Sequence, residues 1–344
     1  MYWVFFLNFF INLLFCKMFE YPVVSIVISN FNKVEYLSDT ICSVINQTYK
    51  NWQLIIVDDF STDNSVCLIN SFLIKEPRIK LYVNTRNEGA NYSRNFGIEH
   101  SNGEYIVFLD ADDLLVNSCL LERVALMNKN PSCDFIVFTM GVFNKKIGDN
   151  LSLWLPNKKK ALTDFLQHKL PWGILQPIWR RRFLDELGGF DLRFKRMQDV
   201  ELHTRSLLKE NVIFEVVIAS PDCFYRIDEG RKNYAPYELL NRWVDSTALY
   251  IDKFYYPSVK LNCSNYLFGT FLKIYMQIIY NYRKNKISKN DFLLLESKLL
   301  GSIKPMSLNK FRKLIIKLSK IYNLYIIRIP GINWMLNKFI CIDI

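Results

Sequence analysis

The chain has 344 residues, of which 50% are hydrophobic and 22% are charged, a composition that excludes an intrinsically disordered protein and supports a sizeable core. Its formal net charge is +11, and much of the excess lies at the C-terminal end, where residues 301–344 hold eight Lys and Arg against one acid, Asp343. A nucleic-acid-binding protein more often spreads its basic side chains over the folded body, so we expect no nucleic-acid partner.

The first sixteen residues are apolar except for Asn8 and Asn12. A membrane-spanning helix needs about 20 residues, and the segment lacks the basic start and small-residue cleavage site of a secretory signal. Three interpretations remain open: an interfacial anchor, a short span, or an upstream extension of a chain whose working start is Met18. We set residues 1–20 apart as an apolar N-terminal segment.

From residue 21 onward, short apolar runs alternate with helical patterns. The runs at 23–29, 52–57, 79–83 and 104–109 are nearly continuous and β-branched, which is typical of strands buried on both faces of a parallel sheet. Helical patterns at 34–46, 64–74 and 90–100 separate them, and the alternation predicts βαβ units.

The chain beyond residue 115 is less regular. We expect a helix at 118–128, a strand at 134–140, a polar excursion or hairpin over 141–160, and a helix that leads to Gly188-Gly189. After residue 233 the alternation stops, and the remaining sequence is aromatic and helical in pattern. The eight cysteines form no CxxC pair, which predicts a reducing compartment without a disulfide framework.

Acidic residues follow two of the predicted strands: Asp58 and Asp59 the second, and Asp110, Asp112 and Asp113 the fourth. In open α/β sheets, ligands bind at the carboxyl ends of the strands. Five carboxylates at one edge would repel one another unless a cation neutralised them. Residues i and i+2 of an extended segment point the same way, so the D-x-D pair can face one Mg²⁺ or Mn²⁺ ion. The alternative is a turn in which an aspartate caps the next helix; we expect Asp113 to be such a cap or to lie behind the ligands.

Other candidates are less specific. Asp58 and Asp59 can accept hydrogen bonds from a base or ribose, or can instead form a turn before the next helix. Phe31, beside Asn32, can stack on a nucleobase or merely pack in its loop. Arg94 can reach a phosphate or be an ordinary surface arginine. The three histidines show no catalytic pattern.

Four segments, in this order, resemble the motifs of the family 2 glycosyltransferases of the GT-A fold, of the bacterial surface-polysaccharide type: SIVISNFN, IIVDDFSTD, NEGANYSRNFGIEHSNGEYIVFLDADD and GGFDLRF…QDVEL. The resemblance covers about residues 21–226. It implies an α/β fold with a Rossmann-like, mixed, mostly parallel sheet flanked by helices. It implies a GT-A domain at 21–235, with a nucleotide-sugar-binding half (21–115) and an acceptor half (116–235). The motifs do not extend beyond this domain, and from its pattern and charge we expect 236–344 to be a helical, basic C-terminal region.

The resemblance implies roles for individual residues. Asp199 matches the catalytic base, and Asp112 and Asp110 match the metal-binding pair, with Asp112 the more direct ligand. Two positions depart from the family pattern: Gln198 replaces a usual Glu beside the base, and Phe60 replaces a usual Gly, so we expect the backbone there to avoid positive φ. The implied nucleotide-sugar-binding residues are Ser29, Phe31, Asn32, Asp58, Asp59, Arg94, Asp110, Ala111 and Asp112.

The implied reaction is an inverting transfer of a sugar from a nucleoside diphosphate, expected to be UDP, to a hydroxyl of a glycan or lipid-linked acceptor in cell-surface polysaccharide synthesis. Mn²⁺ or Mg²⁺ would stabilise the departing diphosphate, and Asp199 would take the acceptor proton. The alternatives are a metal-dependent phosphatase with a D-x-D site and a catalytically inactive nucleotide-sugar-binding homologue, which Gln198 alone supports.

The basic C-terminal tail also contains apolar residues at helical spacing. Such a tail predicts contact with an anionic membrane surface, and hence a cytoplasmic protein bound peripherally at the inner face of the cytoplasmic membrane. The alternative is an ordinary solvated helix face.

Overall fold

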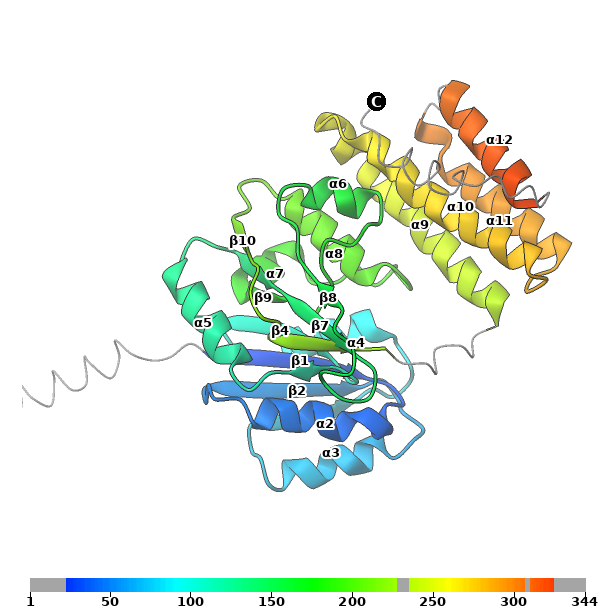
Figure 1. Ribbon diagram of the computed structural model, residues 1–344. Helices are drawn as coiled ribbons and strands as arrows, with labels where there is room; N and C mark the ends of the chain where they lie inside the picture. The colour runs from blue at the N-terminus through cyan, green and yellow to red at the C-terminus, as the bar shows by residue number, and fades with distance from the viewer. Residues whose placement is uncertain (1–22, 228–234, 307–309, 325–344) are drawn as a thin grey trace, which may run out of the picture.

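The computed structural model describes residues 23–227, 235–306 and 310–324 (Figure 1). The predicted apolar segment 1–20 and the end of the basic tail, 325–344, lie outside these ranges. Within them, an α/β domain built around a central sheet is followed by a group of long helices that packs at its side.

Seven strands of the described chain form the central sheet, which is mostly parallel and confirms the predicted fold class. β1 pairs in parallel with β2 and β4, and β2 pairs in parallel with β3, so the four predicted apolar runs lie side by side. The sheet order is β10 (Phe214–Val217), β6 (Phe135–Phe138), β9 (Pro177–Arg180), β4 (Tyr105–Asp110), β1 (Val24–Asn30), β2 (Trp52–Asp58) and β3 (Ile79–Val83).

Two strand assignments differ from the expectation. The strand expected at 134–140 is two strands, because the chain leaves the central sheet after β6 and enters a second sheet as β7 (Met140–Phe143). β9 was not predicted; it inserts antiparallel between β4 and β6. It has only four residues and runs directly into a helix. It is therefore too short to show the alternation of apolar and polar residues from which a strand could be predicted.

Helices cover both faces of the central sheet. Alternate side chains of β1 enter two separate apolar cores: Val24, Ile26 and Ile28 lie in one, and Val27 in the other. The first core is closed by α2 (Val34–Ile45), α3 (Ser65–Leu73) and α5 (Cys119–Lys129). The second is closed by α4 (Ala90–Glu99), α6 (Ala161–Leu166), α7 (Arg181–Leu187) and α8 (Gln198–Leu207). Burial on both faces explains why these strands are nearly continuous apolar runs.

A second, smaller sheet begins with the strand that follows β4 in the chain. Its order is β5 (Leu114–Leu115), β11 (Cys223–Arg226), β7 and β8 (Leu153–Trp154). β7 and β8 pair antiparallel, so the segment 141–160 contains the hairpin that the sequence suggested. Because β5 follows the D-x-D segment directly, this sheet supports the edge at which the aspartates lie.

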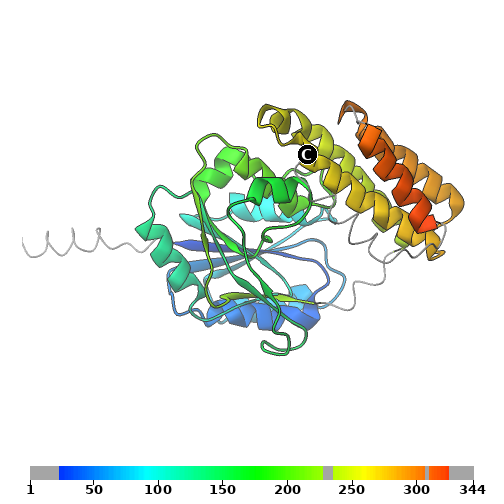
Figure 2. The same ribbon diagram turned by 45° about the horizontal axis from the view of Figure 1, so that its top comes forward.

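The C-terminal helices are α9 (Pro236–Lys260), α10 (Leu267–Arg283), α11 (Lys289–Ser302) and α12 (Lys310–Leu324), with short 3₁₀ turns at Ser264–Tyr266 and Lys304–Met306. They do not build a separate core: the apolar cluster that contains Val27 continues through α9, α10 and α11 to Ile315 of α12. Figures 1 and 2 show α12 on the side of this bundle that is far from the sheet. Within the described ranges, every helix is too short or too polar to cross a bilayer.

Candidate active site

The carboxyl ends of β1, β2 and β4 meet at one edge of the central sheet. The register pairs Ser29 of β1 with Asp110 of β4, and Asn30 of β1 with Asp58 of β2. The loops that follow these strands therefore begin side by side, where open α/β sheets bind their ligands.

Asp58 organises the turn that follows β2. Its carboxylate is buried and accepts hydrogen bonds from Asn30 Nδ2 at 2.6 Å and from the backbone and hydroxyl of Ser61 at 2.8 and 2.7 Å. Within the turn from Asp58 to Ser61, Phe60 adopts φ 66°. The expectation that Phe60 would avoid positive φ was therefore wrong. A left-handed residue other than glycine costs about 1–2 kcal/mol. The two hydrogen bonds from Ser61 to Asp58 close the turn and offset that cost.

Asp59 fixes the beginning of α4. It is buried, and its two oxygens accept hydrogen bonds from Asn84 Nδ2 and from the backbone N–H groups of Glu88 and Gly89, each at 2.8 Å. Gly89 is the residue that precedes α4, and it has φ 93°. Because α4 carries Arg94, Asp59 sets where that arginine enters the site.

The β1 loop and the β2 loop are joined through Asn32. Its Oδ1 accepts a hydrogen bond from the backbone N–H of Thr62 at 2.8 Å. The neighbouring Phe31 is 44% exposed, which leaves its ring accessible to a stacking partner. The two predicted loop residues thus lie together at the edge of the sheet. Asn32 joins the two loops, and Phe31 leaves its ring exposed.

Each aspartate of the D-x-D pair is matched to a cation of the chain. Arg94 is buried rather than on the surface, and its Nη2 lies 2.8 Å from Asp110 Oδ1. The Nζ of Lys33 lies 2.7 Å from Asp112 Oδ2. Lys33 was not a sequence candidate; its position directly after Asn32 is the signal that could have identified it.

The backbone of the D-x-D segment is held from behind. Arg226, at the end of β11, donates from its backbone N–H to Asp113 Oδ1 and from its Nε to the carbonyl of Asp112, both at 2.8 Å. Asp113 therefore lies behind the pair, as expected. Ala111 is buried, and its carbonyl accepts a hydrogen bond from Thr40 of α2 at 3.1 Å.

The carboxylates of Asp110 and Asp112 suit a divalent cation whose remaining ligands are oxygens of a diphosphate. Among the described residues, no group of three or more His, Cys, Asp or Glu side chains is arranged to hold a metal ion. However, Mg²⁺ and Mn²⁺ in phosphate-transfer sites are commonly held by one or two carboxylates together with substrate oxygens. The side chain of Asp110 is 30% exposed and its ion pair with Arg94 involves one oxygen, which suits that arrangement. Lys33 occupies one oxygen of Asp112, so a cation bound there would compete with the ammonium.

Asp199 lies in the first turn of α8, directly after Gln198. Arg94 and Asp110, at the strand edge, both act on its ionisation. Burial raises the pKa of the Asp199 carboxyl; the Val200 backbone N–H and Arg94 oppose this increase, and Asp110 adds to it. Asp110, Arg94 and Asp199 therefore share one electrostatic neighbourhood.

His168 and His203 lie in apolar surroundings. Burial lowers the pKa of both His168 and His203 to about 3, so both imidazoles are neutral at physiological pH. His203 stacks on Trp179 with ring centroids 5.6 Å apart. Their environment is that of core aromatic residues.

Comparison with known sequences gives the same family as the motifs. The sequence model described as "Glycosyl transferase family 2" matches residues 25–188. The chain is 37% identical over 233 residues to the Escherichia coli UDP-Glc:alpha-D-GlcNAc-diphosphoundecaprenol beta-1,3-glucosyltransferase WfgD, an alignment that covers 67% of this chain and 87% of WfgD. It is 36% identical over 148 residues to a glycosyltransferase of Haemophilus influenzae, of which it spans 58%, with 42% of this chain covered.

Solved structures agree with the fold. TarS 1–349 of S. aureus, crystallised with UDP-GlcNAc, superposes with a TM-score of 0.64 at 16% identity, covering 88% of this chain and 89% of that one. At this identity the similarity shows the fold, and it confirms the expected GT-A architecture. Together with the long alignment to WfgD, these matches show that the chain belongs to family 2 of the glycosyltransferases.

Proposed function

We propose that the chain is an inverting glycosyltransferase that transfers a sugar from a UDP-sugar to a hydroxyl of a lipid-linked glycan in surface-polysaccharide synthesis. The observation that carries the proposal is that Asp110 and Asp112 follow β4 at the carboxyl edge of the sheet, where Arg94 pairs with Asp110 and both act on the ionisation of Asp199. Membership of the family makes the phosphatase alternative unnecessary.

The proposed chemistry assigns one task to each group. As the acceptor oxygen bonds to the anomeric carbon, Asp199 takes its proton, and the bond from that carbon to the diphosphate oxygen breaks. A carboxylate with a raised pKa is the stronger base for this step. The positively charged guanidinium of Arg94 lies beside Asp110, where negative charge develops on the departing diphosphate. A divalent cation held by Asp112 and Asp110 would neutralise the departing diphosphate.

The similar proteins support the choice of donor and acceptor. WfgD is named for a UDP-glucose donor and a diphosphoundecaprenol-linked acceptor, and TarS was crystallised with UDP-GlcNAc. We therefore take UDP-glucose and UDP-GlcNAc as the first donors to screen, by thermal stabilisation of the full chain with Mn²⁺. A donor that binds the folded chain raises its melting temperature.

The test of the base is Asp199→Asn. A general base contributes about 10²–10⁴-fold, so turnover of the UDP-sugar should fall by that factor while UDP binding persists. Asp185→Asn, on the exposed end of α7, is the matched control and should retain wild-type turnover. Near-normal turnover of Asp199→Asn would refute the assignment. Wild-type protein without hydrolysis or transfer of any UDP-sugar with Mn²⁺ would instead support the inactive-homologue alternative.

The test of the cation is the Mn²⁺ dependence of UDP binding. Asp112→Ala should weaken binding in Mn²⁺ and leave the weak binding in EDTA unchanged. Binding that stays Mn²⁺-dependent at wild-type strength in this variant would remove Asp112 from the metal site.

We also propose that α12 binds an anionic membrane surface at the inner face of the cytoplasmic membrane. Its solvent face presents Lys310, Lys313, Leu314, Lys317 and Leu318 at helical spacing, all exposed. Lysines beside exposed leucines match a surface that offers both anionic headgroups and an apolar boundary.

Flotation with phosphatidylglycerol–phosphatidylcholine vesicles tests this surface. Each basic residue near an anionic membrane contributes about 1 kcal/mol, so the double variant Lys313→Glu, Lys317→Glu should bind at least about 30-fold more weakly. The control reverses two exposed lysines of the β7–β8 hairpin, Lys145 and Lys146. Unchanged flotation of the α12 variant, or an equal loss in the control, would refute the assignment.

A further inference from the structure

Helix α9 lies against the segment that carries the proposed base, although the motif resemblance ends before it. Four side chains of α9 face residues 191–204: Ser246, Thr247, Tyr250 and Lys253. Their spacing places them on one face of the helix. The C-terminal helices therefore touch the motif segment directly.

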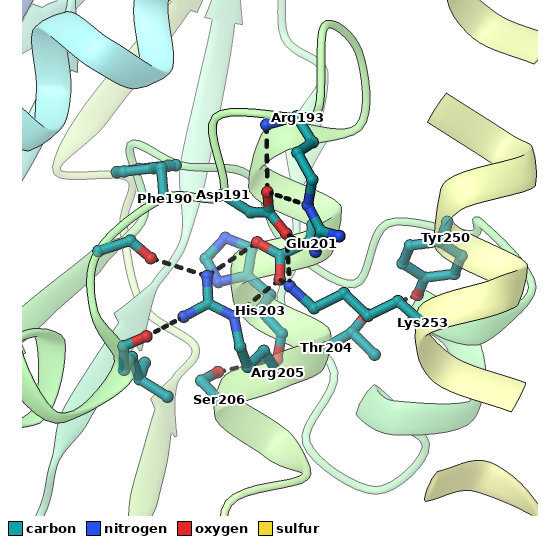
Figure 3. A network of polar contacts seen from close by, with 12 residues as sticks. Phe190, Asp191, Arg193, Glu201, His203, Thr204, Arg205, Ser206, Tyr250 and Lys253 are labelled. Atoms are coloured by element: carbon teal, nitrogen blue, oxygen red, sulfur yellow. Dashed lines mark hydrogen bonds and ion pairs between the residues drawn. The ribbon is translucent and has the colours of Figure 1, made fainter. Parts of the chain in front are cut away.

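Lys253 joins two parts of the motif. Its Nζ lies 2.7 Å from Asp191 Oδ2, in the turn after Gly188-Gly189, and 2.7 Å from Glu201 Oε1, in α8 (Figure 3). The side chain of Glu201 is only 1% exposed. A buried carboxylate needs a cation and hydrogen bonds, so its position is closely determined by these partners.

The two carboxylates also have arginine partners. Arg193 Nη2 lies 2.6 Å from Asp191 Oδ2, and Arg205 Nε lies 2.7 Å from Glu201 Oε1. Arg205 further donates to the carbonyls of Leu187 and Gly189. Removal of Lys253 would thus leave each carboxylate paired with its arginine, and would break only the two ion pairs that these carboxylates make with α9.

Helix α9 holds the beginning of the segment as well. Ser246 Oγ accepts a hydrogen bond at 3.0 Å from the backbone N–H of Arg196, and Thr247 Oγ1 lies 3.7 Å from the sulfur of Met197. Met197 precedes α8 and has φ 60°. The direction in which α8 starts is therefore set by contacts with α9 on both sides of Asp199.

Helical geometry connects this anchor to the chemistry. Successive residues of an α-helix are rotated by about 100°, so Glu201 points about 200° away from Asp199. An ion pair that holds Glu201 against α9 consequently turns Asp199 toward the strand edge. A displacement of about 1 Å in a reacting group can cost about 10²-fold in rate.

We propose that Lys253 is a positioning residue for the base: it fixes the rotation of α8 through Glu201, so that the C-terminal helices determine where Asp199 points. The inference rests on the proposed function, because it takes Asp199 as the base.

The experiment compares Lys253→Met, Lys253→Arg and the control Lys260→Met, an exposed lysine at the end of α9, in the full chain. The assay is hydrolysis of UDP-glucose and UDP-GlcNAc with Mn²⁺. We expect kcat of Lys253→Met to fall about 10–100-fold, with KM for the UDP-sugar within about threefold of wild type. The arginine variant should recover most of kcat, and Lys260→Met should match wild type.

Several results would overturn the inference. A Lys253→Met variant with a lower melting temperature but wild-type kcat at 20 °C would show a purely structural role. Equal losses in kcat and in UDP binding for Lys253→Met would also show a purely structural role. So would a Lys253→Arg variant that recovers none of the lost kcat. If Lys253→Met does not fold, Glu201→Gln carries the test, because it weakens the attraction to Lys253 and should show the same selective loss of kcat.

Asp199→Asn in the same assay separates the two proposals. If Asp199→Asn retains turnover, the proposed function fails whatever Lys253 does. If Asp199→Asn is inactive and Lys253→Met behaves as wild type, only the positioning role fails.

Discussion

The buried ion pair between Arg123 and Asp222 supports the D-x-D edge from a distance, and its removal gives a sharp prediction. Arg123 of α5 is fully buried; its Nε and Nη2 lie 2.7 and 2.8 Å from the two oxygens of Asp222, and its Nη1 donates to the carbonyl of Leu175 at 3.1 Å. Asp222 precedes β11, the strand that ends at Arg226. The pair thus anchors the strand that holds the backbone of the aspartate segment.

The perturbation is Arg123→Met, which keeps the volume of the side chain and removes its charge. The cost is set by Asp222, whose side chain is 5% exposed and would lose its counterion. Breaking a buried pair in this way costs about 3–5 kcal/mol. Urea unfolding of the full chain should show this decrease in the free energy of unfolding.

Two further variants test the reasoning. The double variant Arg123→Met, Asp222→Leu should recover much of the loss, because replacing both partners with apolar residues removes the buried unpaired charge. Arg182→Met is the control; Arg182 is mostly exposed, its ion pair with Asp134 spans 3.8 Å, and it should cost no more than about 1 kcal/mol. A loss below about 1 kcal/mol for Arg123→Met, or a double variant less stable than the single, would refute the argument.

Four other predictions follow from the structure. Burial raises the pKa of Asp199, so turnover should decline as the pH falls through a value above the ordinary aspartate pKa of about 3.9, and an acid limb at or below that value would contradict the assignment. Because the pKa of Asp199 is higher in the folded chain than in the unfolded chain, ionisation of this carboxyl at pH 7 lowers the free energy of unfolding. Asp199→Asn should therefore be more stable than wild type in urea unfolding at pH 7. Lys33→Gln removes the ammonium 2.7 Å from the second aspartate of the D-x-D pair, and calorimetry should find tighter Mn²⁺ binding; weaker binding would show that Lys33 does not compete. Gly189→Ala places a methyl group 2.4 Å from Asn95 Oδ1 at φ +67° and should cost more than about 1 kcal/mol in urea unfolding, whereas Gly301→Ala, which meets no atom within 4 Å, should be neutral or stabilising.

The first half of the sheet could be predicted from the sequence because burial on two faces leaves a strong pattern. β1 to β4 agree with the expected runs to within about two residues at either end. β9 could not be predicted, since its pairing with β4 and β6 depends on residues far away in the chain. The same holds for the break between β6 and β7, where the apolar run continues although the strand changes sheets.

The positions of the aspartates were predictable, and their partners were not. Strand ends can be found from local pattern, and they place Asp58 and Asp110 at one edge. Which donor reaches which carboxylate depends on loop paths: Lys33 meets Asp112 across 79 residues of chain. The φ of Phe60 was mispredicted for a similar reason, because residue preference alone does not include the hydrogen bonds that close the turn.

The core shared by the sheet and the C-terminal helices has a mechanical consequence. Val27 of β1 and Ile315 of α12 belong to one packed cluster, and packed interiors resist deformation. The α/β domain and the described helices α9 to α12 should consequently move together, and a force applied at α12 would be transmitted to the strand edge. If α12 binds a membrane surface as proposed, the distance and the orientation of the aspartates relative to that surface would be fixed, and with them the direction from which the proposed acceptor reaches the site.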